Sequence, residues 1–409
     1  MWTKKPGGKS DLAAVARGNA EKLWTSPWMS IDMKCWCGLL SLGGSVFGPP
    51  SNADVLTESI DPMTRFSLKA FSLWLAALVC LPLGSIANAE PIQWVTVGDP
   101  GNTADTDPAG FGAVATSFQI MKYEFTNQQY TDFLTSVAAT DTYSLYNASM
   151  GSDARGGITQ SGLSGSYTYS AKANMGDKPV NYVSWFDAAR VSNWYQNGAT
   201  SSSSTETGAY TLVSGQTTGT APAVNPGATF YVPTENQWYK AAYYKGGGTS
   251  AGYWDFATQS DSAPTAVTAN LTGVGSAGST GNFANVNRGA QWNSQNGNVT
   301  TVGTNGGESA FGAFDMTGNV AEWNDLTGAA GSSRGQRGYY WQGDGNPTYE
   351  SSSYRESVDP SNEDSLAGFR LASPVSVSGV PEIDPNGLSA VLGLIVGGLG
   401  LLERRRYGR

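Results

Sequence analysis

Residues 311–325 read FGAFDMTGNVAEWND, and this segment decides the fold class of the chain. It follows neither the 3.6-residue period of an amphipathic helix nor a long strand alternation. Gly312 and Gly318 interrupt it, which is typical of tight turns between short strands. Similar short aromatic segments are YWDF (253–256), RGYYW (337–341) and GFRL (368–371). Short strands with irregular, glycine-rich connections predict an α+β fold with much coil.

Three helices are predicted upstream of this segment, starting after Thr126, Ser184 and Thr234. Thr126 and Thr234 are each followed three residues later by glutamine, the capping-box pattern, and serine is a favoured N-cap. Strands are expected before the first two helices, over residues 118–125 and from Lys178 to Ser184. We expect the second helix to end at Asn197-Gly198 and the third to continue until Gly246.

The amino-acid composition excludes several classes of structure and of binding partner. Charged residues make up 14% of the chain, the formal net charge is −9, and aromatic residues make up 11%. An acidic balance without basic clusters argues against nucleic acid or anionic lipid as a partner. The aromatic content argues against a disordered stalk, despite the many glycines. The central part of the chain is long enough for one large domain.

Two types of side chain that are common in catalytic and metal sites are scarce or absent in this chain. The chain has no histidine, and its three cysteines are Cys35, Cys37 and Cys80. From Glu90 onward, no side chain can therefore form a thiolate or offer an imidazole to a metal. This excludes cysteine nucleophiles, Ser-His-Asp triads, disulfides and the usual zinc, copper and non-haem iron sites in that part of the chain.

Residues 63–89 have the three-part build of a secretory signal peptide. Arg65 and Lys69 form a basic start, which an apolar core and an A-x-A motif follow. We therefore predict cleavage by signal peptidase between Ala89 and Glu90. A membrane-anchoring helix is the alternative, but the apolar run is short for a bilayer.

Residues 380–409 begin VPEID, continue with an uncharged apolar segment over 387–402 and end in an arginine cluster. The motif residues are Val380, Pro381 and Glu382, and the basic residues are Arg404, Arg405 and Arg406. The apolar segment has 16 residues, below the ~20 of a comfortable membrane span. The tripartite order resembles PEP-CTERM sorting signals of Gram-negative bacteria. The resemblance implies recognition by an exosortase, a transient membrane anchor and delivery to the cell surface or extracellular matrix, whereas a plain tail anchor is the alternative.

Seven segments occur in a fixed order along the chain. They are KYEFTNQQYTDFL (122–134), KPVNYVSWFDAARVSNW (178–194), YVPTENQWYKAAYY (231–244), YWDF (253–256), FGAFDMTGNVAEWND (311–325), RGYYW (337–341) and AGFRLA (367–372). This series resembles the sulfatase-modifying-factor family of the formylglycine-generating enzyme superfamily, which also holds ergothioneine-synthesis sulfoxide synthases and PvdO-type domains. The resemblance implies a modified C-type-lectin-like fold with little regular secondary structure, stabilised by calcium and aromatic packing.

The resemblance and the terminal signals together divide the chain. We expect an over-long, unstructured start (1–62, with Met63 as the initiator), a signal peptide (63–89), a mature N-terminal segment (90–113), the family domain (114–373), a linker (374–379) and the sorting signal with its hydrophobic helix (380–409).

The resemblance also implies where chemistry would lie. Formylglycine generation uses two cysteines near the C-terminal part of the domain to bind copper, and the sulfoxide synthases hold iron with histidines. The corresponding segment here, residues 354–368, contains neither residue type. We therefore expect no copper or iron and no catalytic residue.

One metal site of the family maps onto matching positions. The resemblance implies a calcium site at Asp315 and Glu322, with the backbone carbonyls of Gly318 and Val320, because calcium prefers oxygen ligands. A hydrogen-bonded turn with two solvated acids is the alternative. A second implied calcium site would use Asn270 and the Leu271 carbonyl.

Two functions remain open from the sequence. The first is an exported, non-catalytic, calcium-stabilised binding or structural module of the cell surface or matrix, with an exopolysaccharide or a surface protein as its ligand. The second is an oxidoreductase of the sulfatase-modifying-factor type that acts with an unrecognised metal site.

Overall fold

The computed structural model describes residues 91–213 and 215–375. The expected signal peptide, its cleavage position between Ala89 and Glu90, and the sorting signal with its helix over 387–402 lie outside these residues. Within the described ranges, no helix combines the length and apolar character needed to cross a membrane.

The three predicted helices are confirmed. They are α2 (Asn127–Val137), α4 (Trp185–Gln196) and α5 (Glu235–Tyr243). All three begin with a capping box, in which the N-cap side chain and the third helical residue satisfy each other's amides. Helix α4 ends at Gln196 with Asn197 as its C-cap, as expected, but α5 ends at Tyr243, before the expected limit at Gly246.

Two short helices were not predicted from the sequence. They are α3 (Ala148–Ser152) and α6 (Pro347–Glu350). Each follows an asparagine whose side chain accepts a hydrogen bond from the backbone amide two residues further along the chain. Both are too short to show a helical period in the sequence, which is why the pattern missed them.

The strands are short and form small sheets. A three-stranded antiparallel sheet has the order β1 (Trp94–Val97), β2 (Phe118–Met121) and β11 (Ala372–Pro374). A four-stranded sheet has the order β10 (Ala367–Gly368), β7 (Ala321–Asn324), β8 (Arg334–Arg337) and β9 (Glu356–Val358), with β10 parallel to β7. Two further pairs are β3 (Ile158–Ser161) with β4 (Thr168–Ala171), and β5 (Thr265–Ala266) with β6 (Phe283–Ala284).

Several predicted strands are wrong or too long. The segment from Lys178 to Ser184 forms an isolated bridge between Pro179 and Thr126 instead of a strand. The YWDF segment also forms isolated bridges, and the RGYYW segment leaves β8 after Arg337. A strand needs a partner along its whole length, and alternation within one segment does not reveal whether that partner exists.

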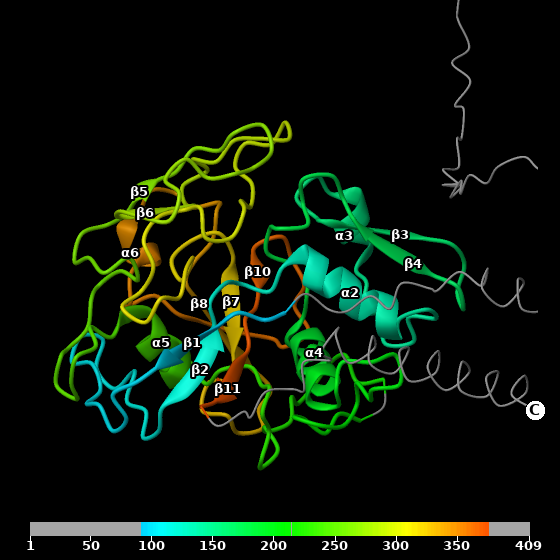
Figure 1. The fold of residues 1–409 in the computed structure, drawn as a ribbon, viewed down its shortest axis with the longest axis horizontal. Coiled ribbons are helices and arrows are strands. Elements are labelled where there is room, and N and C mark those ends of the chain that lie inside the picture. Colours follow the sequence, from blue (N-terminus) through cyan, green and yellow to red (C-terminus); the bar gives the residue numbers. More distant parts are fainter. Residues whose placement is uncertain (1–90, 214, 376–409) are drawn as a thin grey trace, which may run out of the picture. The chain divides into compact units, whose positions relative to one another are not determined.

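The four-stranded sheet lies between helices in Figure 1, with α5 on one side and α2 and α4 on the other. Hydrogen bonds from two indole N–H groups join the sheet region to the helices on both sides. Trp238 of α5 donates to Glu322 of β7 at 2.7 Å, and Trp185 of α4 donates to Asp325 at 2.6 Å. Both tryptophans are fully buried, so aromatic packing and hydrogen bonds together hold α4 and α5 against the sheet region. The fold is α+β, as the sequence predicted.

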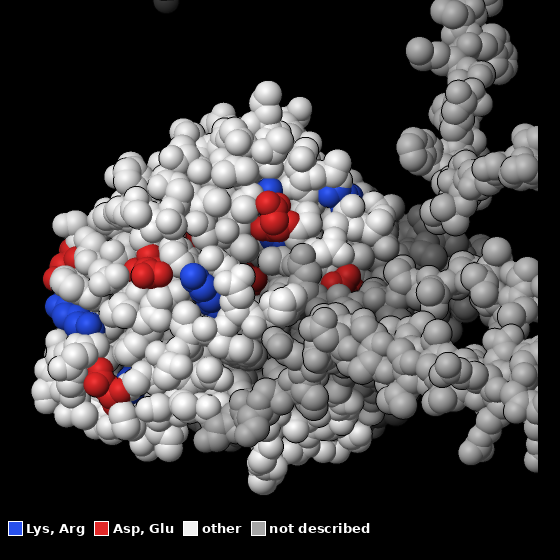
Figure 2. All heavy atoms as spheres, viewed as in Figure 1, with Lys and Arg blue, Asp and Glu red and all other residues white. Residues whose placement is uncertain are grey.

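The surface carries few charges. Figure 2 shows one face on which lysine, arginine, aspartate and glutamate side chains lie scattered among uncharged residues. The exposed large hydrophobic side chains of the described residues are also scattered, and they are Leu163, Val213, Leu271, Phe283 and Val375.

Candidate functional site

The segment that decides the fold crosses the interior of the domain. Strand β7 is buried at all four positions, and Gly318 lies just before it with a φ of 86°. A Cβ atom at Gly318 would lie 2.5 Å from the carbonyl oxygen of Asn285. Only glycine therefore fits this bend, which brings Asp315 and Glu322 into the same buried region.

Glu322 forms a buried ion pair with Arg370. The guanidinium Nη2 lies 2.6 Å from Oε1 and Nε lies 2.6 Å from Oε2, and both side chains are 0% exposed. Arg370 also donates to the carbonyl of Phe314 at 2.8 Å. The pair is bidentate, which is the strong geometry for arginine and carboxylate.

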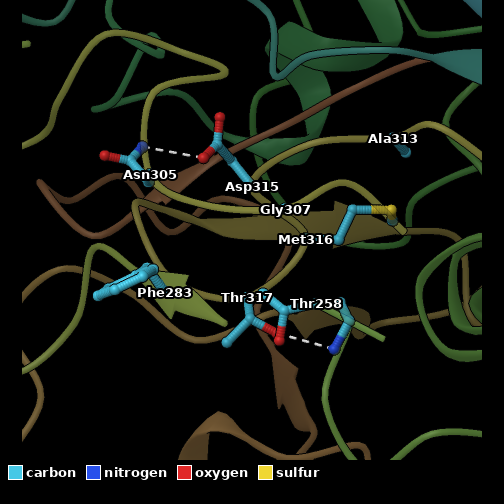
Figure 3. Close-up of a pocket in the computed structure, with 9 residues that line it drawn as sticks. Thr258, Phe283, Asn305, Gly307, Ala313, Asp315, Met316 and Thr317 are labelled. Atoms are coloured by element: carbon cyan, nitrogen blue, oxygen red, sulfur yellow. Dashed lines mark hydrogen bonds between the residues drawn. The ribbon is translucent and has the colours of Figure 1, made fainter. Parts of the chain in front are cut away.

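Asp315 accepts hydrogen bonds from neighbours on another loop. The amide of Gly303 lies 2.5 Å from Oδ2, and Nδ2 of Asn305 lies 2.9 Å from Oδ1. Figure 3 shows Asp315 and Asn305 directed toward each other. Both residues line a cavity of about 10 Å³, the size of a single water molecule. Burial raises the pKa of Asp315 above its usual value, although the two hydrogen bonds act to lower it.

Glu124 is a third buried carboxylate, which the sequence analysis did not single out. It accepts from Nδ2 of Asn319 at 2.7 Å and from the amide of Val320 at 3.2 Å. Burial raises its pKa well above the usual range, and the nearby carboxylates of Asp315 and Glu322 raise it further. Glu124 lies in the KYEFTN segment, but no periodic pattern marks its role.

The carboxylate cluster, defined as Glu124, Asp315 and Glu322, is matched by one arginine, Arg370. Three ionised carboxylates against one guanidinium would leave a buried excess of negative charge, which is costly without a cation or a proton. Oε1 of Glu322 and each oxygen of Asp315 accept one hydrogen bond from the partners above, so each has a lone pair left. These oxygen atoms are the donor type that calcium prefers, but the three carboxylates of the cluster are not arranged as a metal-binding group in the described residues.

The second expected calcium position has a different local structure. The Asn270 side chain accepts from the amides of Thr272 and Val274, at 2.9 and 3.0 Å, and so closes a turn. Leu271 is 93% exposed at the tip of that turn. Within the described residues, no group of three or more histidines, cysteines, aspartates or glutamates is arranged to hold a metal ion.

The segment where the family's copper cysteines would lie is occupied by structural contacts. Arg355 forms a bidentate pair with Glu235 at 2.7 Å, and Arg337 reaches the same carboxylate at 2.9 Å. Arg337 also donates to the carbonyls of Ser352 and Tyr354, both at 2.9 Å. These arginines join α5 to the chain around β9.

The Trp323-Asn324-Asp325 tripeptide is fully buried. Asp325 accepts from Tyr210 at 2.6 Å as well as from Trp185, and it pairs with Arg334 at 3.1 Å. These contacts give the tripeptide a role in the core. A surface ligand cannot reach it.

A separate, open pocket was not predicted from the sequence. We call it the tyrosine pocket, and its lining residues are Arg288, Tyr339, Tyr340, Gln342, Gly343, Asp344, Tyr349 and Tyr354. Its volume is about 350 Å³. The pocket combines the loop after β8 with α6 and a distant loop at Arg288. That convergence depends on tertiary structure, so only the local enrichment in tyrosine could have suggested it.

Comparison with known families gives one match. The family model described as Sulfatase-modifying factor enzyme 1-like domain matches residues 76–375. The match begins before the expected domain start at residue 114 and ends two residues beyond the expected end at 373. A search of curated proteins found no match.

Three solved structures are among those that the chain resembles. The crystal structure of CarF has 22% identity, a TM-score of 0.41 and coverage of 70% of this chain and 99% of that one. Variable protein 1 of Treponema denticola has 16% identity, a TM-score of 0.37 and coverage of 69% and 95%. PvdO from Pseudomonas aeruginosa has 17% identity, a TM-score of 0.34 and coverage of 70% and 92%.

Proposed function

The chain belongs to the sulfatase-modifying factor enzyme 1-like domain family, and from that premise we propose that its domain is a non-catalytic binding module of an exported surface protein. One observation carries this proposal. In the segment where the family places its copper cysteines, the arginines and acids form structural contacts. Arg355 and Arg337 are paired with Glu235, and the side chain of Asp364 accepts from the amides of Leu366 and Ala367.

The absence of cysteine and histidine after Glu90 supports the same proposal. The exported part would contain no cysteine and no histidine, so copper or iron would lack thiolate and imidazole ligands there. Two buried ion pairs of the core, Arg370 with Glu322 and Arg334 with Asp325, engage their charged groups with each other. The tyrosine pocket is open and lined by side chains suited to binding.

Delivery to the surface is part of the proposal. Signal peptidase would cut between Ala89 and Glu90, and an exosortase would remove the tail that begins at Val380. The mature protein would then reside on the cell surface or in the extracellular matrix of a Gram-negative-type bacterium, where an exopolysaccharide or a surface protein is its ligand. Mass spectrometry of the protein recovered from cells should find Glu90 as the first residue and no peptide containing Arg404.

Calcium is proposed as the structural cofactor. Asp315 and Glu322 would hold it with the carbonyls of Gly318 and Val320, and its charge would offset the excess negative charge of the carboxylate cluster. Asn270 and the Leu271 carbonyl are retained as a second, separate calcium position. Neither position implies catalysis, because a hard cation without an open, activated water is a structural element.

The test of the binding proposal is metal content combined with oxygen uptake. The full chain, purified in mild detergent, should hold little copper or iron and consume no oxygen with a thiol-bearing peptide. Stoichiometric copper or iron with peptide-dependent oxygen uptake would instead establish the oxidoreductase alternative. Arg355→Cys, at a partly exposed position in the same segment, is a useful control for adventitious metal capture by a single thiol.

A further inference from the structure

The tyrosine pocket has the size of a small-ligand site. Its volume of about 350 Å³ lies at the lower end of the ~300–1,000 Å³ range of such sites. None of its lining residues belongs to the carboxylate cluster, and none was among the site residues expected from the sequence. It is therefore a second, independent feature of the domain.

The tyrosine rings form two walls that meet at a steep angle. Tyr339 is nearly parallel to Tyr340 and Tyr349, with interplanar angles of 29° and 30°. Tyr354 stands across them, at 83° to Tyr339 and 69° to Tyr349. Tyr339 is buried behind the others, whereas Tyr340, Tyr349 and Tyr354 are partly exposed. The pocket thus offers ring surface on adjacent sides of a small ligand.

The remaining lining side chains surround these rings with both donors and acceptors. Arg288 donates, Asp344 accepts, and the Gln342 amide does both. One positive and one negative side chain leave the lining without a net charge. Tetraalkylammonium ligands also bind aromatic cages, but Arg288 in the lining opposes a cation. The mixture therefore favours a neutral ligand that both donates and accepts hydrogen bonds.

The pocket is held in shape before any ligand arrives. Asn287 donates to Glu350 of α6 at 2.7 Å and accepts from the amide of Gly345 at 2.7 Å, so it joins the loop to the helix. The amide of Arg288 donates to the carbonyl of Trp341 at 2.9 Å. A site fixed in this way loses little entropy on binding, which favours affinity.

Backbone strain at the same place supports a fixed ligand site. Tyr339 has a φ of 62°, a conformation that is unfavourable for a bulky side chain. Arg288 has a φ of 57°, and a Cβ atom at Gly343 would lie 2.3 Å from Oδ1 of Asn287. Strained residues of this kind are concentrated at ligand sites and active sites.

We propose that the tyrosine pocket binds a neutral hexopyranose unit of a polysaccharide, an assignment that rests on the proposed binding function. The C–H face of a pyranose ring is apolar and packs on an aromatic ring, while its hydroxyls both donate and accept. Tyr340 and Tyr349 supply the stacking surface, and Arg288, Gln342 and Asp344 meet the hydroxyls.

The experiment is calorimetric titration of the full chain with neutral tetrasaccharides of glucose, galactose or mannose. At least one of them should bind, and Tyr349→Ala should weaken that binding about tenfold, the loss expected when one aromatic contact is removed. Tyr349→Phe, which keeps the ring, should bind like the parent. Tyr167→Ala is the matched control, because Tyr167 is a partly exposed tyrosine outside the pocket, on the chain before β4.

Three results would overturn the assignment. They are no binding of any of the three sugars, binding that Tyr349→Ala leaves unchanged while the variant melts like the parent, and binding of choline chloride in place of sugar. If Tyr349→Ala fails to fold, Gln342→Ala is tested in its place. That variant should weaken sugar binding without removing a ring. Each result is independent of the metal and oxygen measurements that decide whether the domain is catalytic.

Discussion

Arg370 and Glu322 are the most deeply buried charged pair that joins two of the family segments. They lie in AGFRLA and in GNVAEW, far apart in the sequence, and both side chains are 0% exposed. A charge in such a place is tolerated only with a well-placed partner, since desolvation costs several kcal/mol per ion. Each of the two segments therefore supplies the charge that the other needs in the folded domain.

Removing one member of this pair should destabilise the domain strongly. Arg370→Ala leaves the Glu322 carboxylate buried with only the Trp238 indole as a donor, and we expect a loss of ~3–5 kcal/mol in the free energy of unfolding. Urea denaturation followed by tryptophan fluorescence measures this loss.

The matched control is the partly exposed pair of Lys245 and Asp261, whose charged atoms are 3.8 Å apart. Lys245→Ala should change the free energy of unfolding by less than ~1 kcal/mol, since solvent screens such pairs. Equal effects of the two substitutions would contradict the account of the buried pair.

Helix α4 shows how a local pattern and a distant contact combine. Ser184 was expected as its N-cap, and Asp187 completes the capping box by accepting from the Ser184 amide at 2.8 Å. The sequence could not show that the Asp187 carboxyl is near enough to the Glu363 carboxylate, in a loop far along the chain, to be influenced by its charge. Burial raises the pKa of Asp187 to about 8, with the nearby Glu363 carboxylate contributing to the rise and Arg190 opposing it.

Stability should therefore fall with rising pH on account of Asp187. Between about pH 4 and pH 8 the folded protein keeps the Asp187 proton, whereas the unfolded chain releases it, so ionisation favours unfolding. Asp187→Asn removes this proton while its side-chain oxygen can still accept from Ser184. The variant should be more stable than the parent at pH 8, on the order of a few kcal/mol, and similar at pH 4.

Thermal melts of both proteins from pH 4 to pH 8 measure the effect. A shallower dependence on pH in the variant agrees with the assignment. Parallel curves would show that Asp187 ionises normally in the folded state.

Elements differ in how far the sequence predicts them. Thr126, Ser184 and Thr234 marked their helices correctly because an N-cap acts within four residues of the chain. The expected strand before Ser184 did not form because pairing is decided by residues elsewhere, and in this segment only Pro179 forms a β-bridge. Glu124 and the tyrosine pocket escaped prediction for the same reason, since their partners come from distant segments.

At the scale of the whole molecule, the order of the family segments was the informative signal. The pattern of a few helices, short strands and glycine-rich connections predicted an α+β class with much coil, whereas the order of the segments predicted the family that the match over residues 76–375 shows. The exclusion of cysteine and histidine chemistry needed no structure, because it follows from the residue types present. The contacts that fill the segment around β9 could not be predicted, as they depend on Glu235 of α5.

Calcium binding is tested by the stability of the whole domain. An ion that binds only the folded protein adds ~2.7 kcal/mol at a hundredfold excess over its Kd. A chelator should therefore lower the Tm of the parent by several degrees, and Asp315→Asn should abolish that response. Glu322→Ala should abolish it as well, but it also leaves Arg370 unpaired, so Asp315→Asn is the cleaner variant. An unchanged Tm of the parent with chelator would refute the proposed calcium site.

The central claim is that this family domain binds a ligand and carries out no oxygen-dependent sulfur chemistry. Its most direct test is mass spectrometry of a cysteine-bearing peptide after incubation with the full chain, oxygen, a thiol reductant and added copper or iron. The account predicts that the peptide cysteine is recovered unchanged. Conversion of that cysteine to formylglycine, at a rate that scales with the protein concentration, would contradict it.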